Sequence, residues 1–236
     1  DCEPMRIGGL LKNSTIDYPG KLSCGVFLSG CNFDCPYCHN PDLAQAGSMR
    51  STEISSQDFY RFIDDRKGFL DGVVISGGEP TLQEDLFDLC RHIKQMGYSV
   101  KLDTNGSRPR IIKQLIDEGL VDYIAMDLKT EPAKYATYIK RNCDITAILS
   151  SIRVIMESAI AYEFRTTCVK PIVTAQIIEN ICRLIEGAAV YALQGFYKTE
   201  MLHPEFFKDT DNEYSDDEML QFKTVAAPWV EQCLLR

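Results

Sequence analysis

Three cysteines lie close together in the stretch SGCNFDCPYCHNPDL, which covers residues 29–43. They are Cys31, Cys35 and Cys38, and their thiolates are soft ligands that suit iron–sulfur clusters, zinc or copper(I). A zinc site would need a fourth ligand, and the nearest candidate, His39, directly follows Cys38 and is poorly placed to reach the same small ion. The spacing therefore favours a [4Fe–4S] cluster whose fourth iron is left open for a ligand from outside the protein.

Polar residues and glycines recur where other strand-like segments end. The segments GVVISGG (72–78), YSVKLDT (98–104) and VDYIAMDL (121–128) are rich in β-branched and aromatic residues, as strands are. The residues at or near such ends are Gly77, Gly78, Glu79, Asp103, Thr104, Asp127, Lys129 and Arg165. Because parallel strands bring their carboxyl ends to one rim, we expect these residues to share one pocket.

Six strand-like segments alternate with segments of helical period. The predicted strands are 24–30, 72–78, 98–104, 121–128, 162–169 and 189–196. Apolar residues at spacings of three and four predict helices at 55–66, 81–97, 109–119, 144–159 and 174–187. The alternation implies an α/β fold of parallel strands with right-handed crossovers. A doubly wound open sheet and an incomplete barrel both fit this pattern.

Several residues mark where the predicted helices begin and end. Thr81 with Glu84, and Ser215 with Glu218, have the spacing of a capping box. Glycines stand where three helices should stop, at positions 97, 119 and 187. Pro228 should interrupt the last helix.

Length and composition limit the kinds of protein. We expect residues 1–236 to form one domain, with Met5 as the natural start after residues 1–4 and a C-terminal tail and helix at 203–236. A net charge of −9 argues against binding to duplex nucleic acid, and no apolar run is long enough to span a membrane. The start is acidic, unlike that of a secretory signal, so we predict a cytoplasmic location. The other cysteines are expected to be small buried hydrophobes.

The cysteine motif resembles the signature of radical S-adenosylmethionine (SAM) enzymes, including the aromatic Tyr37 just before the third cysteine. IDYPGK (16–21), SGGEPTLQ (76–83), DTNG (103–106) and DLK (127–129) follow the order seen in activases of glycyl radical enzymes. The sequence is most similar to the activating proteins of anaerobic ribonucleoside-triphosphate reductase. Pyruvate formate-lyase activating enzymes are similar across the same motifs. The resemblance implies a partial (β/α)6 TIM-like barrel.

The resemblance also implies the chemistry. SAM would chelate the open iron of a [4Fe–4S] cluster, and an electron from the reduced cluster would split its sulfonium into methionine and a 5′-deoxyadenosyl radical. The radical would install a glycyl radical on a partner enzyme, anaerobic ribonucleotide reductase above all, with flavodoxin or ferredoxin as reductant. A small molecule or a peptide is the alternative substrate. An electron-transfer module without catalysis would account for the cysteines but not for the residues at the other strand ends.

The family pattern assigns roles to the rim residues. Cys31, Cys35 and Cys38 would hold the cluster, and no acid–base residue is expected because abstraction of a hydrogen atom needs none. SAM would be held by Tyr37, His39, Gly77, Gly78, Glu79, Thr104, Lys129 and Arg165. The glycines would let the backbone approach the methionyl amino group, and Glu79 would accept from that group or hold the loop. Tyr37 would pack near the adenine or brace the cysteine loop.

Asp103 and Asp127 are paired carboxylates that a general acid–base role could use. The resemblance instead implies a monovalent cation held beside the SAM carboxylate by these aspartates, with Thr104 and the carbonyl of Ala125. Pyruvate formate-lyase activases use a histidine on the last strand to hold SAM. Here that strand, YALQGFYK, has Gln194 and no histidine, which favours the reductase-activase branch and leaves open whether Gln194 or the later His203 contacts SAM.

Overall fold

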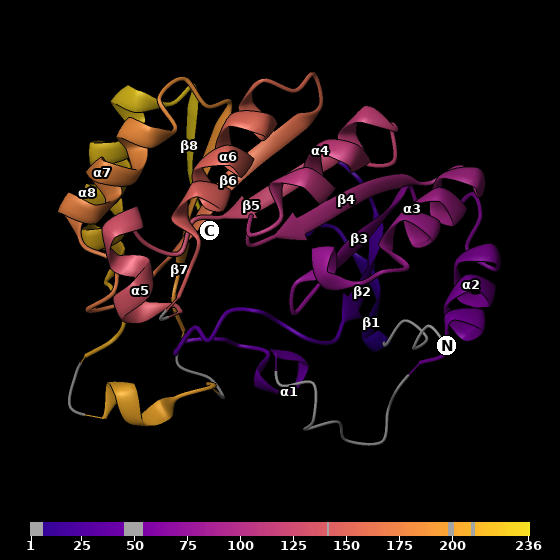
Figure 1. Cartoon of the computed structure of the whole chain (residues 1–236), viewed down its shortest axis with the longest axis horizontal. Helices are drawn as coiled ribbons and strands as arrows, with labels where there is room; N and C mark the ends of the chain where they lie inside the picture. The colour runs from indigo at the N-terminus through magenta and orange to yellow at the C-terminus, as the bar shows by residue number, and fades with distance from the viewer. Residues whose placement is uncertain (1–6, 45–53, 141, 198–200, 209–210) are drawn as a thin grey trace.

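The computed structural model contains one curved eight-stranded sheet (Figure 1). It describes residues 7–44, 54–140, 142–197, 201–208 and 211–236; Met5 and residues 1–4, Cys2 among them, lie outside these ranges. The strands are β1 (Ile7–Ser14), β2 (Ser23–Leu28), β3 (Gly72–Gly77), β4 (Ser99–Thr104), β5 (Tyr123–Asp127), β6 (Ala161–Cys168), β7 (Val190–Gly195) and β8 (Gln232–Leu235). Every neighbouring pair is parallel except β1 with β2.

The strand order decides between the two architectures that the sequence allowed. The strands lie side by side in chain order from β1 to β8, so each new strand is added to the same edge of the sheet and the strand order never turns back. A doubly wound sheet requires such a reversal, so the fold is an incomplete barrel. Within the described residues the edge strands β1 and β8 do not pair with each other, and Figure 1 shows them well apart.

All six predicted strands are present, but the barrel has seven parallel strands and not six. β8 was not predicted, because its four residues QCLL follow Pro228 and were assigned to the C-terminal tail. β1 was also missed, because its glycines at positions 8 and 9 weaken the strand pattern. The antiparallel β1 extends the sheet beyond the barrel strands.

Six longer helices lie around the outside of the curved sheet (Figure 1). They are α2 (Ser56–Asp64), α3 (Leu86–Gln95), α4 (Pro109–Asp117), α6 (Ile145–Met156), α7 (Ala175–Leu184) and α8 (Asp216–Ala226), and two single-turn helices, α1 (Pro41–Ala44) and α5 (Tyr135–Tyr138), lie near the cysteine loop. None of the described helices is long and apolar enough to cross a membrane.

Most of the predicted helix boundaries are confirmed. Ser215 and Glu218 form the expected capping box of α8, and Gly97, Gly119 and Gly187 adopt the left-handed conformation just beyond helix ends. The predicted capping box of Thr81 is wrong. Thr81 belongs to a separate turn, Pro80–Leu82, where its backbone N–H and hydroxyl both donate to Glu79, and α3 begins only after Asp85.

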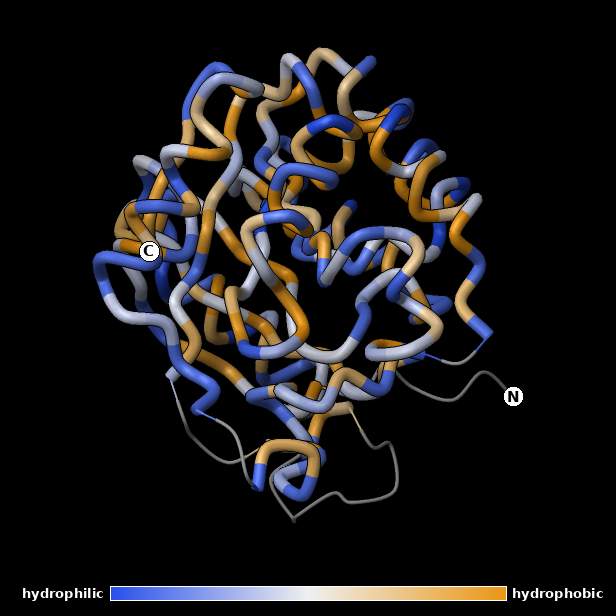
Figure 2. Tube along the Cα trace, turned by 90° about the vertical axis from the view of Figure 1, so that its left-hand side faces the viewer, coloured by the Kyte–Doolittle hydropathy of each residue, from blue (hydrophilic) through white to orange (hydrophobic). Residues whose placement is uncertain are grey.

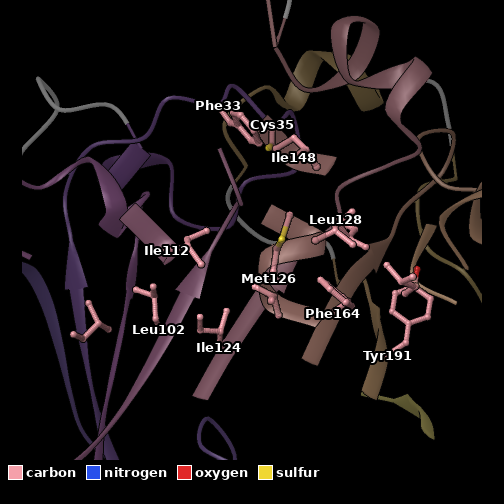
Figure 3. Packing of buried hydrophobic residues seen from close by; sticks show 14 of the residues in the cluster. Phe33, Cys35, Leu102, Ile112, Ile124, Met126, Leu128, Ile148, Phe164 and Tyr191 are labelled. Atoms are coloured by element: carbon pink, nitrogen blue, oxygen red, sulfur yellow. The ribbon is translucent and has the colours of Figure 1, made fainter. Parts of the chain in front are cut away.

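The apolar core fills the space between the sheet and the helices. Figure 3 shows Leu102, Ile124 and Phe164 from three neighbouring strands beside Ile112 of α4. In Figure 2 the outer turns are mainly hydrophilic, whereas hydrophobic residues gather along the strands and on the helix faces turned toward them. The buried thiols outside the cysteine loop, at positions 24, 90, 168, 182 and 233, belong to this core as predicted, and the partly buried Cys143 packs against it.

The opposite, inner face of the sheet carries charge. Side chains alternate between the two faces of a strand, so Val100 and Leu102 of β4 face the helices while Lys101 and Asp103 face the barrel interior. Asp103 leads to the carboxyl end of β4, where the rim residues gather.

Candidate active site

A cavity of about 240 Å³ opens at the carboxyl ends of the parallel strands. It brings together most residues that the sequence singled out: Cys31, Cys35, Tyr37, Cys38, His39, Gly77, Gly78, Asp103, Thr104, Asp127, Lys129 and Arg165. The prediction of one shared pocket is therefore confirmed for these residues. Two predicted site residues, Glu79 and Ala125, do not line it.

The cysteine loop follows β2 and is tied to its surroundings by backbone hydrogen bonds. Gly30 N donates to Leu43 O at 2.7 Å, and Asp34 N donates to Ile139 O at 3.0 Å, so both α1 and the turn after α5 hold the loop. Figure 3 places Phe33 and Cys35 above the core residues at the strand ends. The loop thus turns its thiols toward the cavity.

The thiols suit a large, soft, positively charged group. Burial raises the pKa of the Cys31 thiol and raises that of Cys35 to about 12, so a bound metal must supply the charge that ionises them. Among the described residues, no three His, Cys, Asp or Glu side chains are arranged to hold a single metal ion. The three thiols on one cavity wall are soft ligands of the kind that iron–sulfur clusters take.

Gly77 and Gly78 bring the end of β3 against the start of the cysteine loop. A Cβ on Gly78 would lie 2.1 Å from Gly30 O, and one on Gly77, whose φ is +120°, would lie 2.3 Å from Leu28 O. Gly78 N donates to Leu28 O and Glu79 N donates to Gly30 O, both at 2.8 Å. Only glycine allows this approach, so the pair positions the loop and exposes backbone on the cavity wall.

Two carboxylates and three cationic side chains form an ionic network at the cavity; all of them line it except Lys101, which is buried next to Asp103. Arg165 Nε lies 2.8 Å from Asp127 Oδ1, and an Arg165 terminal nitrogen lies 3.4 Å from Asp103 Oδ2. Lys129 Nζ lies 2.9 Å from Asp127 Oδ2, and Lys101 Nζ lies 2.5 Å from Asp103 Oδ1. Burial opposes ionisation of both aspartates, but Arg165 and the lysines outweigh it and lower their pKa values. Both aspartates therefore stay ionised at neutral pH.

The profile described as Radical SAM superfamily matches residues 26–185, more than half of the chain. The chain belongs to the radical SAM superfamily. It is also similar, with 35% identity over 238 residues, to a protein of Methanocaldococcus jannaschii with the provisional name glycyl-radical enzyme activating enzyme; the match covers 98% of this chain and 95% of the relative. A pyruvate formate-lyase-activating enzyme of Listeria monocytogenes is 36% identical over 138 residues, which cover 52% of this chain and 53% of the relative.

Solved structures give the same fold. Streptococcus suis SuiB bound to S-adenosylmethionine superposes with a TM-score of 0.67 at 12% identity, over 89% of this chain and 51% of SuiB. The chain therefore spans about half of SuiB and shares its fold. The predicted partial TIM-like barrel is confirmed. The radical SAM family, which the matching profile shows, has a [4Fe–4S] cluster and SAM as its cofactors.

Glu79 does not line the cavity of this radical SAM enzyme, and its side-chain contacts are with the neighbouring loop and the end of β4. The side chain is fully buried, and its Oε1 accepts from the backbone N–H and hydroxyl of Thr81 and from Thr104 Oγ1, while its Oε2 accepts from Asn105 N at 2.6 Å. The second predicted role is the one observed: Glu79 holds the loop.

The four residues that were predicted to hold a monovalent cation all make other contacts in this structure. Ala125 lies in the β5 ladder opposite Asp103, is fully buried and contributes nothing to the cavity lining. Thr104 lines the cavity, but its hydroxyl donates to Glu79 and accepts from Gly106 N. All four oxygens of Asp103 and Asp127 face a cationic nitrogen.

The other residues that were considered as SAM contacts lie either in the cavity or outside it. Tyr37 is buried and its hydroxyl donates to Lys129 O at 3.5 Å, which braces the cysteine loop. His39 stacks on Phe196 at the cavity edge, and burial lowers its pKa. Gln194 lines the cavity, whereas His203 lies outside it.

Several cavity residues had no predicted role, although Ser76 and Asn105 stand at strand ends that were expected to form the pocket. These cavity residues are Phe33, Asn40, Ala44, Ser76, Asn105 and Thr167. Asn105 stands inside the quoted DTNG motif, and its side chain donates to Asn32 Oδ1 at 2.9 Å and accepts from Ser107 N, so it links the cysteine loop to the end of β4. The sequence signal that could have identified it is an asparagine in a turn, because its side-chain amide can both donate and accept hydrogen bonds.

Proposed function

We propose that this radical SAM enzyme installs a glycyl radical on a partner protein. The observation that carries the proposal is the likeness along almost the whole chain to a relative named as a glycyl-radical enzyme activating enzyme. When bound, the cluster and SAM supply a 5′-deoxyadenosyl radical, which can take a hydrogen atom from a glycine of the partner.

The residues of this chain bind and orient the reactants. Cys31, Cys35 and Cys38 hold the cluster, and Lys129 and Arg165 present positive charge toward the carboxylate of SAM across the cavity. Phe33 and Tyr37, both buried, exclude water from the base of the loop. No cavity residue needs to act as a general base, which agrees with the full engagement of Asp103 and Asp127 in ion pairs.

An accessible barrel supports a macromolecular substrate. The described edges β1 and β8 do not pair, so the barrel is not closed into a ring by strand pairing. A glycine-bearing loop of a partner can approach a site at the strand ends of such an open barrel. A small-molecule or peptide substrate is the alternative, and the experiment below separates the two.

We propose anaerobic ribonucleotide reductase as the partner, with flavodoxin or ferredoxin as the electron donor. The motif order of the reductase activases supports this choice. Gln194 on β7 supports it too, because it lines the cavity where a pyruvate formate-lyase activase is expected to present a histidine.

The test is electron paramagnetic resonance (EPR) on an anaerobic mixture of reconstituted enzyme, a chemical reductant, SAM and the large subunit of an anaerobic ribonucleotide reductase. We expect a glycyl-radical doublet that is absent when Cys35→Ala replaces the wild type. Formation of 5′-deoxyadenosine without the doublet would exclude this partner. If a cluster-loaded enzyme cleaved no SAM, an electron-transfer role would replace the activase proposal.

A further inference from the structure

Lys101 is a buried lysine inside the barrel. It lies on β4, its side chain is 1% exposed, and its ammonium contacts Asp103 Oδ1 at 2.5 Å with the Tyr123 ring 6.0 Å away. Lysines are almost never fully buried unless they are paired, and the desolvation of such a pair often costs more than its attraction returns. A hydrophobic side chain at this position would avoid that cost, so the buried charge must have a use that offsets it.

The ionic network indicates such a use in terms of net charge. Without Lys101, the two carboxylates of Asp103 and Asp127 would balance Arg165 and Lys129, and the wall would be neutral. With Lys101 the network carries one net positive charge. The neighbouring Glu163 adds no net charge, because the guanidinium of Arg236 forms two hydrogen bonds with it at 2.8 and 2.7 Å.

The position of Lys101 matches the role that the family resemblance implied for a monovalent ion. Two acids facing the anionic carboxylate of SAM need a cation between them, since like charges at close range repel. In this structure the oxygen of Asp103 that Arg165 does not face is held by the lysine ammonium. The protein thus supplies from its own chain a charge that a bound ion would otherwise bring.

We propose that Lys101 is a positioning residue that takes the place of a monovalent cation, so that this enzyme binds SAM equally well with or without sodium or potassium. The ammonium holds Asp103 in place and leaves the wall positive toward the SAM carboxylate. The proposal rests on SAM binding by this radical SAM enzyme and not on the identity of the partner.

The first measurement uses the wild-type enzyme with its cluster. SAM is titrated at equal ionic strength in potassium, sodium or tetramethylammonium buffer, and binding is followed by the change in the EPR spectrum of the reduced cluster. We expect the same affinity in all three buffers. Tighter binding in potassium or sodium than in tetramethylammonium would overturn the proposal.

The variant Lys101→Met keeps the length of the side chain and removes its charge. We expect SAM to bind about tenfold or more weakly in tetramethylammonium, as for one positive charge removed from the network, and to regain affinity when potassium can reach Asp103. Unchanged affinity in all buffers would overturn the proposal. Lys94→Met, which breaks a partly exposed pair with Asp122 outside the cavity, is the matched control and should show neither effect.

A double variant separates the charge from the fold. Lys101→Met with Asp103→Asn removes one charge of each sign, so the wall is again positive but offers no carboxylate at that position for an ion. We expect SAM affinity near that of the wild type, with no dependence on the buffer cation. If the double variant bound SAM as weakly as Lys101→Met while both kept their clusters, the charge argument would fail.

Discussion

Replacing Glu79 should weaken folding and not SAM recognition itself. Glu79 accepts from Thr81, Thr104 and Asn105 in a site without solvent contact, and each such bond to a charged group contributes about 1.5–3 kcal/mol. Glu79→Ala leaves these donors without their acceptor and opens a void. We expect a loss of about 4 kcal/mol in the free energy of unfolding.

Glu79→Gln should cost less, about 2 kcal/mol. Its carbonyl oxygen can still accept from Thr81 and Thr104, but its amide group then meets the N–H of Asn105 with a donor facing a donor. The assay is urea denaturation of the apo-protein, followed by fluorescence and circular dichroism. Glu118→Gln, at the exposed residue that follows the last residue of α4, is the control and should change stability by less than about 0.5 kcal/mol.

The opposite result would refute the loop-holding role. If Glu79→Gln unfolded like the wild type and yet bound SAM much more weakly in the cluster-loaded enzyme, Glu79 would act directly on the ligand. The two readouts therefore separate the predicted ligand role from the observed structural one.

Three further changes test other parts of the site. Arg165 and Lys129 lower the pKa of Asp127 below its usual 3.8, so the stability it contributes is fully present above that pH and is lost as pH falls below it. Denaturation of Asp127→Asn and wild type should differ at pH 7, and the difference should begin to shrink only below pH 3.8. Gly78→Ala places a Cβ against Gly30 O and should lower the iron content per chain, whereas Gly97→Ala, with open space around it, should not. His203 is bonded to Asp34, which raises the pKa of His203, so this contact is strongest below about pH 6.5 and weakens as pH rises. The protection of the residue 203 amide, whose N–H donates to Pro36 O, is its exchange rate corrected for the base-catalysed intrinsic rate. This protection should fall toward high pH in the wild type and be low throughout in His203→Asn.

The parallel strands were predictable because each is buried on the helix side and rich in β-branched residues. Each of the six was found within two residues of its expected limits at either end. β8 was not, because four residues after a proline carry too little pattern to distinguish a strand from a tail. Its pairing with β7 depends on contacts distant in sequence, which no local propensity encodes.

The cluster ligands were predictable from spacing alone, since three thiols within eight positions suit few sites besides an iron–sulfur cluster. The roles of the acids were not. Glu79 follows two glycines on the rim, and its residue type is equally suited to a ligand amine or to buried backbone donors. Only the fold decides, because the turn Pro80–Leu82 and the end of β4 close around the carboxylate.

Lys101 shows most clearly why an alternating strand pattern is ambiguous. In YSVKLDT the lysine falls between Val100 and Leu102, and at the surface of an ordinary sheet such a position would face water. Here the sheet curves on itself, so the face opposite the helices becomes an interior where an ammonium must have a partner. Asp103, two residues later on the same face, provides it; Asp103 lines the cavity, and Lys101 pairs with it without lining the cavity itself. The curvature of the sheet turns a position that would otherwise face water into a buried partner of a residue that lines the cavity. A lysine two positions before a rim aspartate is therefore worth testing wherever such a barrel carries one.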